Sequence, residues 1–147
     1  CVKRLRLPAL PFSAGKNADE ASNFAVGTGD TVSTRLGQHK CFEVITRVHV
    51  EEAIGNIKLE NTEYFDPTTA ARIGKLVGVD YLVTGAVQQT GGRYRMSAKR
   101  LEAETGKVLE NVVVDGTDPF ALQDRLAAAL TKQIQATELD RFLPARP

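Results

Sequence analysis

The stretch Ile73–Val87, IGKLVGVDYLVTGAV, joins two patterns of different period. Its first half continues a helical spacing of apolar residues, and its second half is a β-branched run typical of a buried strand. Gly78 stands between them, where helices commonly end because glycine adopts a positive φ without steric cost. The stretch therefore predicts a helix that ends at Gly78 and turns directly into a strand.

The pair Gly74-Lys75 raises the alternative of a phosphate-binding loop. That motif runs from a strand through G-x-x-x-x-G-K-[ST] into the N-terminus of a helix. Here Leu76 follows the lysine, and the glycines come after a helical pattern and before a strand. Because this order is the reverse of a phosphate loop, we interpret the stretch as a structural helix-to-strand junction.

Upstream of this junction, strand patterns alternate with helical ones. The expected elements are a strand over residues 5–12 that ends near Pro11, a helix over 19–40, a strand over 41–46, a short helix within 47–57, a polar connector over 61–65 and a helix that begins at Asp66-Pro67. Gly27 and Gly29 each cost about 1 kcal/mol relative to alanine inside a helix. We therefore expect another backbone to pass close to the first helix at these glycines.

Downstream, three strand patterns are separated by short turns. Strands are expected over residues 80–90, 93–104 and 107–116, with turns at Gly91-Gly92 and Thr105-Gly106. Asp118-Pro119 then begins a long helix that ends before Pro144. The order β-α-β-α-α-β-β-β-α predicts an α/β domain with a mixed sheet, a C-terminal antiparallel meander and helices mainly on one face.

Composition fits one soluble globular domain. The chain has 147 residues, of which 42% are hydrophobic and 25% charged, and its formal net charge is +1. This balance does not indicate a nucleic-acid partner, and no apolar run reaches the roughly 20 residues that span a bilayer. We expect a single domain over residues 1–147, with a core at about 5–136 and a tail at 140–147.

The two cysteines differ in their surroundings. Cys41 opens the apolar run CFEVI and is expected to be buried as a small hydrophobic residue. Cys1 is what remains when a signal peptide is removed ahead of a lipid-modified cysteine, and a cut within a longer protein gives the same start. The first origin places the protein at the periplasmic face of a bacterial outer membrane, and the second leaves a cytoplasmic location open.

No set of residues has the spacing of a catalytic or metal site. His39 and His49 lack the companion ligands of a zinc motif, and no serine lies in a G-x-S-x-G elbow. Two acidic pairs could in principle act as acid/base groups. Glu51 and Glu52 are neighbours on a short helix and do not face the same way. Glu102 and Glu104 are expected on a solvated strand face beside a turn. We expect no enzyme, cofactor, metal or small-molecule substrate.

Basic residues form the main surface feature. In RYRMSAKR, strand alternation places Arg93, Arg95 and Lys99 on the face away from the core, and Lys3, Arg4 and Arg6 lie around the first strand. These six residues are either a solvated charged face or a docking surface for an acidic protein partner. Without interleaved exposed aromatic residues, they do not predict nucleic-acid binding.

Several segments together resemble a known family. ALPF, FEVITR, ARIGKLVGVDYLVTGAV, GGRYRMSAKRLEAETGKVLE and DPFALQDRLAAAL are similar, in this order, to the curli-secretion (CsgG) and TolB amino-terminal-like domains, over about residues 5–134. The resemblance implies a non-catalytic module of the bacterial cell envelope that works by binding partner proteins or copies of itself. Members of this group include lipoproteins that form secretion pores, support flagellar structures or activate peptidoglycan synthases.

Two alternatives to an envelope module remain open. FALQD, residues 120–124, is most similar to the branch found in cytoplasmic cyclase and tetratricopeptide-repeat proteins, which implies a regulatory domain of a larger signalling protein. The short turns leave no room for the long hairpins with which pore-forming members build a membrane barrel. The second alternative is an enzyme with a nucleotide site at GTGDT, residues 27–31.

Overall fold

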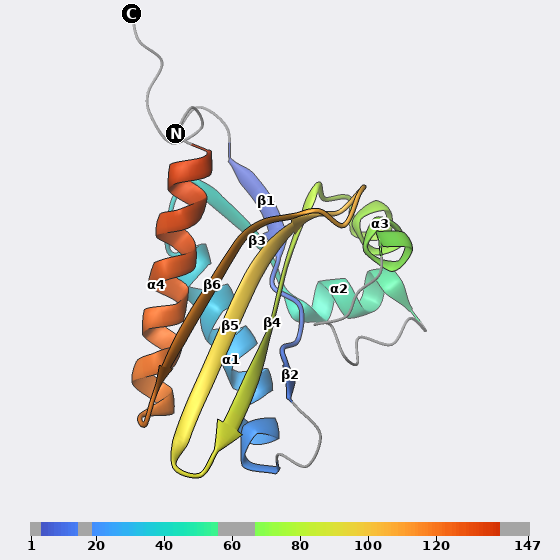
Figure 1. Ribbon diagram of the computed structural model, residues 1–147. Coiled ribbons are helices and arrows are strands. Elements are labelled where there is room, and N and C mark those ends of the chain that lie inside the picture. Colours follow the sequence, from blue (N-terminus) through green and yellow to red (C-terminus); the bar gives the residue numbers. More distant parts are fainter. Residues whose placement is uncertain (1–3, 15–18, 56–66, 139–147) are drawn as a thin grey trace, which may run out of the picture.

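The computed structural model describes residues 4–14, 19–55 and 67–138, and the elements follow the predicted order with one added short strand (Figure 1). The described elements are β1 (Leu5–Pro8), β2 (Ser13–Ala14), α1 (Asp19–Gly37), β3 (Phe42–Ile45), α2 (Arg47–Ile54), α3 (Pro67–Val77), β4 (Tyr81–Thr90), β5 (Arg93–Glu102), β6 (Val108–Gly116) and α4 (Pro119–Thr137). The predicted α/β class and C-terminal meander are confirmed. The expected connector at 61–65, the Asp66 cap and the tail at 140–147 lie outside the described residues.

The first predicted strand, at residues 5–12, is regular only over β1, and β2 begins just after the predicted end. β1 pairs in parallel with β3, whereas β2 pairs in parallel with β4 at the edge of a sheet ordered β2-β4-β5-β6. Between them, Ala9 forms an isolated bridge with Val83, and the Leu10 amide donates to the Val83 carbonyl at 2.8 Å. Pro11 has no amide hydrogen to donate to a ladder, so regular pairing stops before it.

The helices lie on both sides of β4. Successive residues of a strand point to opposite faces, so Val83 joins the core beneath α1 and α4, whereas Leu82 joins a second core with α2 and α3. The two longest helices cover the same face of the β4-β5-β6 meander, and the shorter α2 and α3 pack near the start of β4 (Figure 1). The opposite face of β5 and β6 carries no described helix.

The junction at Gly78 has the predicted geometry. Gly78 has a φ of 79°, and the amides of Gly78 and Val79 donate to the Gly74 carbonyl at 2.8 and 2.9 Å. These bonds satisfy a carbonyl that the end of α3 would otherwise leave free. Gly74-Lys75 therefore belongs to a helix C-terminus, and the phosphate-loop alternative does not fit.

Gly29 of α1 packs against the segment that joins β1 to β2. A Cβ at this position would be 3.2 Å from the Leu10 carbonyl oxygen and 3.3 Å from the Phe12 ring. The close backbone approach expected at the glycines of the first helix is therefore confirmed at Gly29, whereas a Cβ at Gly27 would meet only the Gln123 side chain, at 3.8 Å. Among the described helices, none is long and apolar enough to cross a membrane.

Candidate docking surface on the sheet

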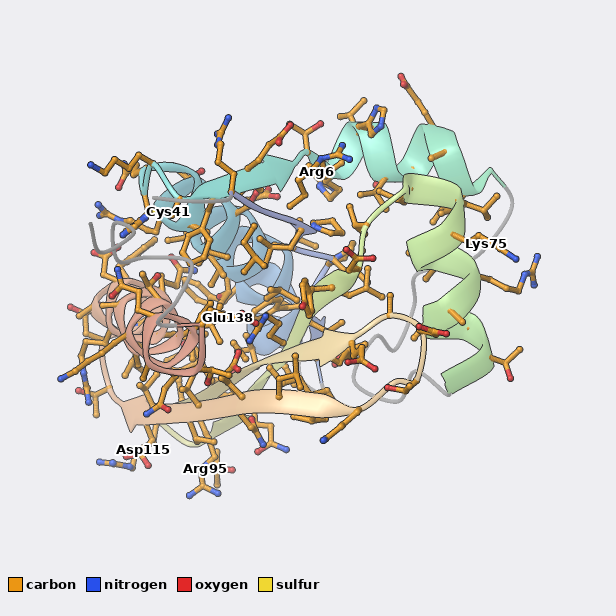
Figure 2. The ribbon with its side chains drawn as sticks, turned by 90° about the horizontal axis from the view of Figure 1, so that it is seen from above. Arg6, Cys41, Lys75, Arg95, Asp115 and Glu138 are labelled. Atoms are coloured by element: carbon orange, nitrogen blue, oxygen red, sulfur yellow. The ribbon has the colours of Figure 1, made fainter. Side chains whose placement is uncertain are left out.

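The outer face of β5 carries the predicted row of basic residues. Arg93 and Arg95 are exposed and Lys99 is half-buried, while Met96 and Ala98 between them are fully buried against the helices. Figure 2 shows Arg95 and Asp115 projecting from the sheet on the side away from α4. The period-2 alternation thus separates charge from core as predicted.

One acidic residue partly neutralises this row. Arg93 donates to the Asp115 carboxylate at 3.1 Å, and their side chains are 64% and 49% exposed. Arg95 lies between Gln88 and Asp115 in the strand register, and the described residues give it no ion pair. A shallow depression of about 290 Å³ lies beside it, lined by Gln88, Thr90, Arg93, Tyr94, Arg95 and Asp115. Arg95 is therefore available to a carboxylate from outside the chain.

The basic residues of the first strand lie elsewhere. Arg4 donates to the Phe42 carbonyl at 3.2 Å, and Arg6 donates to the Gly78 carbonyl at 3.2 Å and pairs with Glu43 at 3.5 Å. Figure 2 places Arg6 and Arg95 on opposite sides of the molecule. The six predicted residues therefore do not form one surface, and Cys1 and Lys3 lie outside the described residues.

Within the described ranges, Cys41 and His39 take part in packing and hydrogen bonding, whereas His49 lies on the surface. Cys41 is buried, as predicted, and its amide donates to His39 Nδ1 at 3.1 Å. The other ring nitrogen of His39 lies 2.7 Å from Gln135 Nε2, which ties α4 to the turn before β3. His49 is exposed on α2. No group of potential metal ligands occurs in residues 4–14, 19–55 and 67–138.

The GTGDT segment and the acidic pair Glu102 and Glu104 also belong to the fold and form no nucleotide or acid/base site in the described residues. Residues 27–31 lie in the middle of α1, where their backbone amides are used by the helix. Thr28 and Thr31 both contact Gln123 of α4, at 3.0 and 3.4 Å. Glu104 lies two residues beyond the end of β5, in the turn, so its expected place on a strand face beside Glu102 was wrong.

A buried ion network is the main feature that sequence analysis missed. Arg100, on the inner face of β5, is fully buried and binds the Glu110 carboxylate through two nitrogens at 2.5 and 2.7 Å. Its third bond goes to Glu138 at the end of α4, at 2.9 Å, and its guanidinium lies 4.7 Å from the centre of the Tyr81 ring. Burial opposes the charge of Arg100, but bonds to Glu110 and Glu138 outweigh it and raise its pKa.

An open groove lies between α3 and the turn after β5. It encloses about 930 Å³, and its charged lining comprises Arg72, Lys75, Asp80, Glu102 and Glu104. Figure 2 shows Lys75 on α3, projecting away from the sheet. Since charges of both signs line an open and largely exposed space, the groove does not select a ligand of one charge.

Comparison with protein families gives one match. The model of the family described as curli production assembly/transport component CsgG matches residues 11–100, which is more than half of the chain. No curated protein sequence matches.

Solved structures share the fold at low sequence identity. A dodecamer of a PelC variant from Paraburkholderia phytofirmans matches with a TM-score of 0.60 and 12% identity, covering 92% of this chain and 91% of the PelC chain. Lipoprotein GNA1162 from Neisseria meningitidis matches with a TM-score of 0.60 and 17% identity, covering 91% and 98%. TolB from Acinetobacter baumannii has a TM-score of 0.57 and 14% identity, covering 91% of this chain but only 29% of TolB.

Proposed function

Because the chain belongs to the CsgG family, we propose that it is a non-catalytic protein-interaction and assembly module of the bacterial cell envelope. The observation that carries this proposal is the family match over residues 11–100 together with a shared fold along nearly the whole chain. One protein of this fold is described as a dodecamer and another as a lipoprotein. Assembly and lipid anchoring are thus both compatible with the fold.

The outer face of β5 is the surface we assign to partner binding. Arg95 is an exposed cation on β5, and Lys99 lies on the same face four residues away. Cations held on a sheet speed the encounter with an acidic surface and penalise a basic one. The preferred partner is therefore a protein with an acidic patch. Arg4 and Arg6, which bind backbone carbonyls of this chain, are assigned a structural role.

Anchoring through Cys1 is the second part of the proposal. A lipoprotein of this fold supports it. A single acyl chain binds a bilayer only marginally, so stable anchoring requires more than one chain or a membrane-bound partner. A lipidated Cys1 would place the domain at the periplasmic face of the outer membrane.

Fractionation of the native host tests the envelope assignment. The protein is purified from its own membranes, its intact mass is measured, and the N-terminal peptide is mapped. A mass excess of acyl chains on Cys1 is the expected result. A protein found entirely in the cytoplasmic fraction would contradict the envelope assignment, whereas an unmodified protein in the membrane fraction would remove only the lipid anchor.

A further inference from the structure

The free edge of β6 is the longest unpaired strand edge in the described part of the chain. β6 bonds only to β5, and no described strand follows it in the sheet. It has nine residues, whereas β1 and β3, which form the two-stranded sheet, have four each and β2, at the other edge of the larger sheet, has two. Every second residue of an edge strand directs its amide and carbonyl away from the sheet.

β6 lacks two of the residues that most often protect a strand edge against pairing. Natural edge strands commonly carry lysine or proline for this purpose. The β6 sequence VLENVVVDG has neither lysine nor proline. Glu110 is occupied by Arg100 in the interior, and Asp115 is occupied by Arg93. The centre of the strand presents Val113, which is 55% exposed.

The position of α4 favours a single added strand over a second copy of the domain. α4 packs more extensively on β6 than on β5, and a Cβ at Gly116 would already lie 3.3 Å from Leu122 of this helix. Both views show α4 alongside the outer strand of the sheet (Figures 1 and 2). A second copy paired through β6 would bring its own α4 towards the same space, whereas an extended segment brings only backbone and side chains.

We propose that β6 binds an extended segment of a partner protein as an additional strand, an inference that rests on the proposed interaction function. On the inner face the segment continues the row of Val112 and Val114, so it should carry small apolar or β-branched side chains there. On the outer face, the added segment would lie two strand spacings, or about 10 Å, from β5. A glutamate on that face reaches towards Arg95, which the described residues leave without an ion pair.

Amide hydrogen exchange of the full chain, followed by NMR, tests this directly. The probe is a nine-residue peptide in which valine alternates with threonine and glutamate. Its control is the same peptide with N-methyl groups on alternate amides, which cannot form main-chain bonds. We expect the plain peptide to slow exchange by roughly tenfold or more at alternate residues of β6, and the N-methylated peptide to have no effect.

Two lysine variants separate edge pairing from general adhesion. Val113→Lys should weaken binding of the plain peptide by roughly tenfold, because lysine is a natural edge-blocking residue. Val48→Lys, which places the same change on the exposed surface of α2, should leave binding unchanged. Equal effects of the two peptides, or of the two variants, would overturn the proposal.

Other outcomes distinguish this inference from the proposed function. If an acidic protein partner binds through Arg95 while the β6 amides exchange as in the free chain, the strand addition is wrong and the interaction function stands. If β6 becomes protected without peptide as the protein concentration rises, a second copy occupies the edge, and the proposal of a partner segment is also wrong.

Discussion

Arg100 and Glu110 face each other across β5 and β6 and form a two-point ion pair in which both side chains are almost completely buried. The planar guanidinium of arginine donates two parallel hydrogen bonds to the two oxygens of a carboxylate, which makes this pairing strong and specific. Glu138 adds a third bond from the end of α4. Through Glu138, this network links the C-terminal end of α4 to the interior of the sheet.

Removing one member of this pair should be costly. Glu110→Ala leaves a buried guanidinium with only Glu138 beside it, and we expect a loss of about 3–5 kcal/mol in the free energy of unfolding. Urea denaturation measures this. The double variant Arg100→Met with Glu110→Leu removes both charges and should regain most of the loss. A Glu110→Ala variant with wild-type stability would show that the pair is not formed.

Gly85 should not tolerate even a methyl group. A Cβ there would overlap the Ser97 carbonyl oxygen of β5 and the Phe12 ring. Gly85→Ala is expected to cost about 1–3 kcal/mol through overpacking. Gly92→Ala is the matched control, because a Cβ at Gly92 meets no atom within 4 Å. Thermal unfolding of the two variants should differ clearly, and equal melting temperatures would contradict the packing described.

Two buried threonines should respond to valine substitution with opposite signs. The Thr84 hydroxyl is buried without a hydrogen-bond partner, so Thr84→Val should stabilise the protein by about 1 kcal/mol. The Thr28 hydroxyl donates to the Phe24 carbonyl at 2.6 Å and accepts from Gln123 at 3.0 Å. Thr28→Val should therefore destabilise by about 1–3 kcal/mol. Chemical denaturation gives both values, and the same sign for both variants would refute the assignment.

Asp118 should stabilise α4 as its N-cap. Its carboxylate accepts from the amides of Phe120 and Ala121 at 3.1 and 3.3 Å. Asp118→Ala is expected to cost about 1 kcal/mol. Asp124→Ala, which removes an exposed ion pair with Arg35, should cost less, roughly 0–1 kcal/mol. If the Asp124 variant is the less stable of the two by urea denaturation, the capping role is wrong.

The parts of the fold that depend on local pattern were predictable from sequence. Gly78 marks a helix end because the chemistry of glycine is local, and the alternation of Arg93, Arg95 and Met96 fixes which face of β5 is buried. The same alternation places Arg100 inside, but its partner Glu138 is 38 residues away and belongs to a helix end. No local pattern indicates such a contact.

The candidate site shows the same division. The sequence indicates that Arg6 and Arg95 are exposed, but their separation follows from topology, because β1 pairs with β3 instead of joining the meander. The break between β1 and β2 likewise depends on the long-range bond from Leu10 to Val83. Distances between surface clusters require the strand order, which the sequence pattern alone does not specify.

Site-specific photocross-linking in the native host most directly tests the claim that the outer face of β5 binds a protein partner. The cross-linking amino acid replaces Ser97, between Arg95 and Lys99, and in a control replaces Val48, which is 61% exposed on α2. We expect one discrete protein adduct from position 97, lost on Arg95→Glu with Lys99→Glu but retained on Arg4→Glu. No adduct from position 97, or one equally strong from position 48 and insensitive to charge reversal, would contradict the claim.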